Sequence, residues 1–258
     1  MVLSVRDWRM TEATLERPGR SAIRRQRTRA NLLRAAYFLM SKKGVDATAI
    51  QEITDRADVG FGTFYNYFTS KDDLATHVLD CVINNIGLRN DLITAKMNLT
   101  DPVEIVATSV RCVARELMTN AVWYWWVQRP DLLVARMRAG FRPFGMRDMK
   151  RAVAAGAYDI AEGDLETAWS YLIWLLAGGI KDIVDGHRPA RSERLMAEAV
   201  MRVMGVPLEI AARASKAKLS PYPDLDIDFD FVVGDDAVRA APSESGTQRP
   251  RVSRQASS

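Results

Sequence analysis

The sequence has 258 residues, 48% of them hydrophobic, which is enough for one large domain or two modest ones with a buried core. Its two cysteines, Cys81 and Cys112, are too few and too far apart for a disulfide framework or a metal site, and the longest apolar segment, 168–180, is too short to cross a bilayer. The formal net charge is only +4, but every charged residue within 17–45 is basic and six aspartates lie within 224–236. This asymmetry suggests an anionic partner at the N-terminal end, and a merely solvated arm is an equal alternative on charge alone.

Helical periodicity is nearly continuous over residues 24–216 and strand signals are scarce, so an all-α fold is predicted. The first helix should cover 24–43 and end before Gly44, a residue suited to the position just beyond a helix C-terminus. A short second helix follows from Thr48, whose spacing to Gln51 is that of a capping box.

A third short helix is expected over 60–67. The fourth should begin at Ser70, which can cap the N–H of Asp73, and should run to about residue 98. The next helix begins with a cap, a proline at the first helical position and an acidic residue at the third, namely Asp101, Pro102 and Glu104.

The rest of the chain is also predicted to be helical as far as residue 218. A Trp-rich turn, 123–126, separates the preceding helix from a short helix after Pro130 and a longer one after Pro143. Two long amphipathic helices, 164–185 and 190–204, close the body, and a weak helix follows over 208–218.

Residues 50–67 have the spacing of a helix-turn-helix, a motif whose second helix enters the DNA major groove. The first helix would be Ile50–Arg56, the turn Ala57–Val59 and the recognition helix Gly60–Tyr67. Asp58 occupies the turn position that usually needs a left-handed backbone, which Asp tolerates better than most residues.

The stretch from Gly44 to Leu74, GVDATAIQEITDRADVGFGTFYNYFTSKDDL, resembles the TetR family of bacterial regulators. The family pattern has Gly, Thr and Ile, then Ala-Gly-Val-Ser, then Gly-Thr-hydrophobic-Tyr-x-Tyr-Phe-x-Ser-Lys and an acidic residue before Leu. This sequence departs from the pattern at Asp58, where the family usually has Gly, and at Gly60, where it usually has a capping Ser.

The resemblance implies phosphate contacts for residues with hydroxyl, phenol or ammonium groups and base contacts at the variable positions Phe61 and Asn66. Ordinary half-buried aromatics, or a solvated lysine, are the structural alternatives, and Phe64 and Phe68 are expected in the core. The implied DNA-binding residues are Thr48, Gly60, Phe61, Gly62, Thr63, Tyr65, Asn66, Tyr67 and Lys71.

The resemblance also implies a homodimer formed through the helices near 164–185 and 190–204. Gly178 and Gly179 agree with this, because small residues allow helices to approach closely, although internal core packing is an alternative. A dimer would place two recognition helices roughly 34–36 Å apart on double-stranded DNA, which predicts a palindromic operator.

The middle helices are rich in aromatic and Met side chains, which suit a large apolar effector cavity as well as an ordinary core. Arginines outnumber acidic residues there, which favours a neutral or anionic lipophilic effector, such as a fatty-acyl compound. The candidate ligand-binding residues are Trp123, Trp126, Met137, Phe141, Phe144, Trp169 and Trp174.

These features predict a ligand-responsive DNA-binding regulator, a repressor by expectation, acting in the cytoplasm without a membrane partner. A helical enzyme is disfavoured, because no phosphate loop or catalytic motif is present and the two histidines, His77 and His187, have no ligand-spaced partners. We therefore expect no catalytic residue, metal or cofactor. A helical binding protein with weakened DNA binding is the alternative that Asp58 and Gly60 would favour.

Four segments are thus predicted. They are a basic flexible arm, 1–23, a helix-turn-helix DNA-binding domain, 24–72, a helical effector-binding and dimerisation domain, 73–219, and a disordered acidic tail, 220–258.

Overall fold

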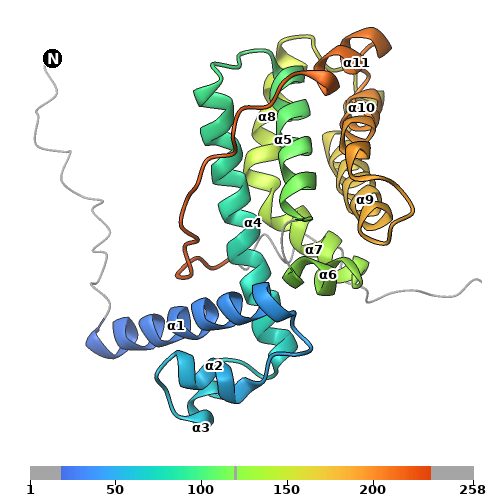
Figure 1. Ribbon diagram of the computed structural model, residues 1–258. Coiled ribbons are helices and arrows are strands. Elements are labelled where there is room, and N and C mark those ends of the chain that lie inside the picture. Colours follow the sequence, from blue (N-terminus) through green and yellow to red (C-terminus); the bar gives the residue numbers. More distant parts are fainter. Residues whose placement is uncertain (1–18, 119–120, 234–258) are drawn as a thin grey trace, which may run out of the picture.

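A computed structural model describes residues 19–118 and 121–233, and these fold into a bundle of helices (Figure 1). None of the described helices is long and apolar enough to span a membrane. Two short 3-10 turns lie at Ala161–Gly163 and Ala190–Ser192. The α-helices are α1 Arg20–Lys43, α2 Ile50–Arg56, α3 Phe61–Phe64, α4 Lys71–Lys96, α5 Pro102–Glu116, α6 Ala121–Val127, α7 Pro130–Gly140, α8 Arg142–Ala154, α9 Leu165–Val184, α10 Glu193–Val203 and α11 Leu208–Lys216.

The first three helices and the start of α4 pack around one end of the hydrophobic core. Leu33, Met40, Ile53, Phe64 and Leu74 are all completely buried there, one or two from each helix. The apolar side of α1 therefore faces α2 and α4, as the amphipathic periodicity of its sequence predicts. Gly44 ends α1 with a positive φ of 83° while its N–H donates to the carbonyl of Met40, which confirms its predicted position.

Helix α4 is the long central element of the molecule. It starts beside α1 and α2 and runs up into the body (Figure 1). The hydroxyl of Ser70 accepts the N–H of Asp73 at 3.0 Å, as predicted, and the carboxylates of Asp72 and Asp73 lie at the positive end of the helix dipole. One continuous helix thus belongs to both halves of the protein.

Helix α5 is packed against α4, α8, α10 and α11 in the body. A buried ion pair secures this arrangement, because Arg111 lies 3.6 Å from the Glu193 carboxylate and donates to the carbonyl of Ala217. Arg115 donates to the same carboxylate at 2.9 Å. The start of α10 and the end of α11 are therefore fixed to α5 by charge as well as by apolar packing.

Three local predictions need correction. Helix α2 begins after Ala49, whose N–H donates to Glu52 at 2.9 Å, one residue later than the predicted Thr48 and Gln51 pair; the bond is one-way, because alanine has no side-chain acceptor. The predicted recognition helix is α-helical only to Phe64 and continues as tight turns to Tyr67. The Trp-rich segment forms α6 instead of a turn, because Trp123 and Trp126, three positions apart, both face the core and pack edge to face.

The ends of the chain also differ from the prediction. Helix α1 begins at Arg20, so 20–23 are helical, and residues 1–18 lie outside the described part. Disorder was predicted from residue 220, but 221–233 run along α4 and bury Phe229 to 6% exposure. Residues 234–258 lie outside the described part.

We predict that Ser70→Ala lowers the free energy of unfolding by about 1 kcal/mol, because α4 loses its side-chain cap. Ser192→Ala is the matched control, since Ser192 occupies the N-cap of α10 without making a capping hydrogen bond; its effect should stay within about 0.5 kcal/mol. Urea unfolding followed by circular dichroism at equal protein concentrations measures both. Equal effects of the two substitutions would contradict this account of how α4 begins.

Candidate DNA-binding surface and effector pocket

The turn between α2 and α3 has the geometry of a helix-turn-helix. The N–H of Ala57 donates to Ile53 at 2.9 Å and that of Val59 donates to Thr54 at 3.1 Å, which turns the chain sharply after α2. Asp58 adopts a φ of 55°, the left-handed conformation that its position was expected to need. Replacing the usual Gly by Asp therefore leaves the turn intact.

Helix α3 and the turn after it have a buried side and an exposed side. Phe64 and Phe68 are 0% and 1% exposed, which confirms that they belong to the core. Phe61 and Tyr65 are 47% and 53% exposed and pack edge to face with each other, and Asn66 beside them is also exposed. The exposed side thus offers an aromatic pair and an amide to a partner.

Helix α1 borders this exposed side. Arg25 donates to the backbone carbonyl of Asn66 at 3.3 Å, and its guanidinium lies 5.4 Å from the centre of the Tyr67 ring. These contacts fix the end of the recognition segment to α1. Arg20, Arg24 and Arg27 on the same helix are exposed, so a positive surface continues from it.

Two of the predicted phosphate-binding residues have structural roles here. Thr48 is 1% exposed, its hydroxyl donates to Gly44 at 2.7 Å and its N–H donates to Val45. The ammonium group of Lys71 donates to the carbonyls of Asp46 and Thr48, both at 3.0 Å. Because its donors already have partners inside the protein, Thr48 is not available to a phosphate, and Lys71 serves first to brace the α1–α2 loop.

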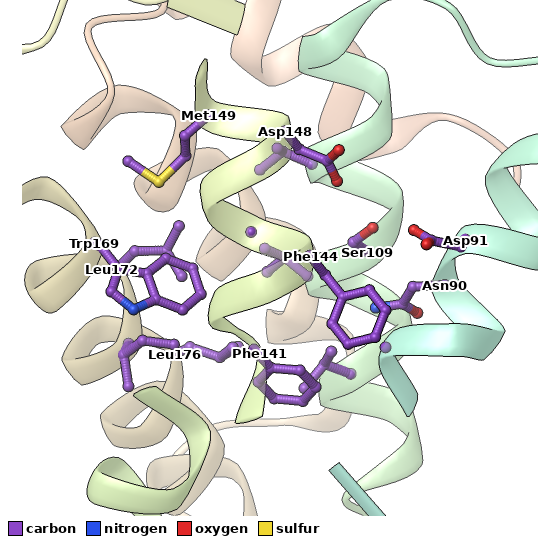
Figure 2. A pocket seen from close by; sticks show the side chains of 16 residues that line it. Asn90, Asp91, Ser109, Phe141, Phe144, Asp148, Met149, Trp169, Leu172 and Leu176 are labelled. Carbon is purple, nitrogen blue, oxygen red and sulfur yellow. The ribbon is translucent and has the colours of Figure 1, made fainter. Parts of the chain in front are cut away.

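A pocket opens between α4, α5, α8 and α9, with a cavity volume of about 80 Å³. Figure 2 shows Trp169 on one side of the pocket and Asn90, Asp91 and Ser109 on the other, with Phe144 beside Asn90. The lining residues are Gly87, Asn90, Asp91, Val106, Ser109, Val110, Val113, Phe141, Phe144, Gly145, Asp148, Met149, Trp169, Leu172, Ile173 and Leu176.

Two glycines allow the aromatic rings of the pocket to approach the neighbouring helices closely. A Cβ atom at Gly87 of α4 would come within 2.3 Å of the Phe144 ring, and one at Gly145 of α8 within 2.2 Å of the Trp169 ring. Both distances are impossible for real side chains, so any other residue would push a ring into the pocket or out of the core. The shape of the pocket therefore depends on these two glycines.

The polar end of the pocket combines two carboxylates with one arginine. Arg147 donates to Asp91 at 2.6 and 2.9 Å and to Asp148 at 2.8 Å, and these hydrogen bonds raise the pKa of Arg147 above its ordinary value. The hydroxyl of Ser109 has no hydrogen-bond partner among the described residues and lies near Asp91 in Figure 2. The pocket thus offers hydrogen-bond acceptors beside an apolar, ring-lined space.

Only three of the seven predicted ligand-binding residues line this pocket, namely Phe141, Phe144 and Trp169. Trp123, Trp126 and Met137 are buried in the core away from it, and Trp174 is 47% exposed on the surface of α9. Aromatic composition alone did not separate pocket from core, because both need the same side chains.

Profiles of known protein families match both the DNA-binding helices and the helical body. Residues 32–78 match the profile described as "Bacterial regulatory proteins, tetR family", and residues 101–216 match "Tetracyclin repressor-like, C-terminal domain". The chain belongs to the TetR family. The resemblance first found in the helix-turn-helix therefore extends over most of the chain.

A solved structure, that of RolR in complex with the ligand resorcinol, is similar to this protein over 78% of this chain and all of that chain, with 28% identity and a TM-score of 0.71. RolR without ligand matches with a TM-score of 0.68 and 27% identity. The similarity thus extends over both the helix-turn-helix and the helical body.

Sequence relatives are more distant or more partial. The repressor KstR2 of Rhodococcus jostii (strain RHA1) is 22% identical over 58% of this chain and 81% of its own length. The uncharacterised regulator YvdT of Bacillus subtilis (strain 168) is 32% identical over 29% of this chain. The matched region covers only 43% of the length of YvdT. Together with the two family profiles and the ligand bound in RolR, the repressor relatives support a ligand-responsive, DNA-binding regulator of the repressor type.

The polar residues of the TetR pocket, Asn90, Asp91, Ser109 and Asp148, were not predicted from the sequence. They come from three helices that meet only in the folded protein, so no local spacing connects them. A usable signal was present nonetheless, because Gly87 and Gly145 interrupt otherwise good helical stretches at a cost of about 1 kcal/mol each, which calls for a packing reason.

We predict that Gly145→Ala lowers the free energy of unfolding by about 1–3 kcal/mol, because the new methyl group overlaps the Trp169 ring. Gly62→Ala is the stability control, since a Cβ there meets nothing within 4 Å; it should leave stability unchanged or raise it by up to about 1 kcal/mol. Thermal unfolding of the free protein separates the two. A Gly145→Ala variant as stable as the parent protein would show that Trp169 is free to move aside.

Proposed function

We propose that this protein is a dimeric repressor that binds a palindromic operator and is released by a small, neutral, hydroxylated aromatic compound. The observation that carries the proposal is the ring-sized pocket with carboxylates at one end, attached through α4 to a helix-turn-helix with an exposed reading surface. The proposed role is regulation of transcription in the cytoplasm, without catalysis.

The exposed side of α3 supplies the DNA contacts. Phe61 and Asn66 would contact base edges, because a phenyl ring suits a thymine methyl group and an amide can pair with adenine. Thr63, Tyr65 and Tyr67 would bind phosphates through their hydroxyl groups. A Cβ atom added at Gly60 or Gly62 would meet little or nothing, so both glycines leave room for the DNA backbone.

The dimer would form through α9 and α10, where apolar side chains remain exposed. Tyr171 and Trp174 are 60% and 47% exposed at helical spacing from Gly178, and Leu195 on α10 is 68% exposed. A Cβ at Gly178 meets nothing within 4 Å, whereas Gly179 packs against Met196 of the same chain. Packing within one chain thus accounts for Gly179, whereas Gly178 would pack against a helix of the partner subunit.

The pocket argues for a smaller effector than the fatty-acyl compound expected from the sequence. A cavity of about 80 Å³ is well below the roughly 300–1,000 Å³ of pockets for drug-sized ligands. The arginines of this region are also largely paired, since Arg147 is held by two carboxylates and Arg142 by Glu166. An O–H donor on a single ring therefore suits the site better than an anion, and resorcinol, the ligand in RolR, has this chemistry.

We predict that Tyr65→Phe weakens binding to operator and scrambled DNA alike, by about tenfold, because it removes a hydrogen bond to a charged phosphate. Asn66→Ala should weaken operator binding by about tenfold and leave scrambled DNA within about twofold, because it removes a base contact. Fluorescence anisotropy on labelled duplexes from upstream of the gene measures both. If Asn66→Ala weakens the two duplexes equally, Asn66 does not read bases.

The effector class is tested by adding resorcinol, benzene and dodecanoate to the protein–operator complex. Resorcinol should raise the operator dissociation constant by about fivefold or more, within the usual range of allosteric coupling. Benzene lacks the hydroxyl donors and dodecanoate is too long for the cavity, so neither should release the operator at the same concentration. Release by dodecanoate alone would instead support a lipophilic chain as effector.

A further inference from the structure

Residues 221–233, here named the strap, connect the effector pocket with α1 of the DNA-binding domain. The strap leaves α11 at the top of the body and descends along the outer side of α4 to α1 (Figure 1). The family profile ends at residue 216, so the strap lies beyond the part of the chain that matches the family.

The strap is held by alternating side chains. Ile227, Phe229 and Phe231 are turned toward the protein and are buried or half-buried, whereas the intervening aspartates are exposed. The side chain of Asn85 on α4 donates to the strap carbonyls of residues 225 and 226 at 3.0 and 3.2 Å. This pattern of one buried face and one solvated face marks a docked segment with a defined register.

The lower end of the strap is fixed to α1 and to the adjoining part of α4. The Phe229 ring lies 5.9 Å from the Tyr37 ring and 5.6 Å from the Arg34 guanidinium, both on α1. The thiol of Cys81 on α4 faces the carbonyl of Phe231 at 3.7 Å, and burial raises the pKa of that thiol to about 12. Phe229, against α1, and Phe231, against α4, therefore connect two helices whose relative angle positions the recognition helix.

The upper end of the strap touches the effector pocket. The hydroxyl of Tyr222 donates to the side-chain oxygen of Asn90 at 2.8 Å and lies 3.2 Å from the carbonyl of Ile86 on the same helix as a second acceptor. Asn90 lines the pocket (Figure 2). Arg89 lies over the Tyr222 ring at 4.0 Å and donates to the carbonyl of Pro223 at 2.7 Å. Because Tyr222 occupies the oxygen of the amide, the NH₂ group of Asn90 remains to donate to a ligand.

We propose that Tyr222 is a positioning residue for Asn90 and that the strap transmits the state of the pocket to α1. A ligand that accepts a hydrogen bond from Asn90 changes the strength of the Tyr222 contact at the other side of the same amide. The strap then holds α1 against α4 more or less firmly, which changes the orientation of the recognition helix. This inference rests on the proposed function for its ligand, and on the contacts of the strap for its path.

The first experiment measures operator affinity with and without resorcinol in the parent protein and in four variants, two point substitutions and two shortened chains. Tyr222→Phe removes one hydroxyl and keeps the ring under Arg89, and its matched control is Tyr124→Phe, at an exposed tyrosine of α6. A chain ending at Ser220 lacks the strap, and its control ends at Val233 and keeps it. Circular dichroism establishes that each variant is folded, and Tyr222→Phe decides the matter if the shorter chain is not.

Tyr222→Phe and the chain ending at Ser220 should reduce the resorcinol-induced change in operator affinity by about fivefold or more, while both controls stay within about twofold of the parent protein. A merely structural strap would lower stability and leave this ratio unchanged. An unchanged ratio in a folded Tyr222→Phe variant overturns the proposal.

A second measurement needs no effector, and it tests the role of the strap separately from the proposed effector class. If resorcinol fails to release the parent protein, the proposed effector class is wrong, and hydrogen exchange of α1 amides then tests the strap. Asn90→Ala should raise exchange at α1 by about fivefold. Adding Tyr222→Phe should raise it by less than the product of the two single effects, because both substitutions remove the Tyr222–Asn90 hydrogen bond and only the second also removes the contact with the Ile86 carbonyl. Unchanged exchange at α1 in Asn90→Ala would overturn transmission through the strap.

Discussion

The long helix α4 runs through the hydrophobic core that joins the DNA-binding helices to the body, and the rest of the structure depends on this. Its first turns, with Leu74 and Val78, are completely buried against the DNA-binding helices. Its later turns, with Gly87 and Asn90, form a wall of the pocket. With 26 residues and a rise of about 1.5 Å per residue, the helix is stiff enough to carry a tilt from one end to the other.

Two side connections determine how a tilt of α4 acts on α1. The indole N–H of Trp125 on α6 donates to Asp46 in the α1–α2 loop at 3.1 Å, and the strap holds α1 through Phe229 on the opposite flank. Because packed interfaces of this kind switch between discrete arrangements more readily than they deform, a small change at the pocket can reorient the helix-turn-helix.

The DNA-binding half could be predicted from the sequence because its signals are local. The caps at Ser70 and Asp101, the left-handed Asp58 and the buried Phe64 each follow from neighbouring residues. The pocket could not, because Gly87 meets Phe144 only after α4 and α8 cross. The strap was missed for another reason: the acidic composition of 224–230 outweighed the alternation of Ile, Phe and Asp that also indicates a half-buried extended segment.

Coupling between pocket and operator is the central claim, and reciprocity tests it most directly. Resorcinol binding should be measured by calorimetry with the free protein and with its operator complex. The account predicts that the operator weakens resorcinol binding by the same factor by which resorcinol weakens operator binding, since linkage requires it. Equal resorcinol affinity for the free and the DNA-bound protein would contradict the account, because the pocket and the recognition helices would then be independent.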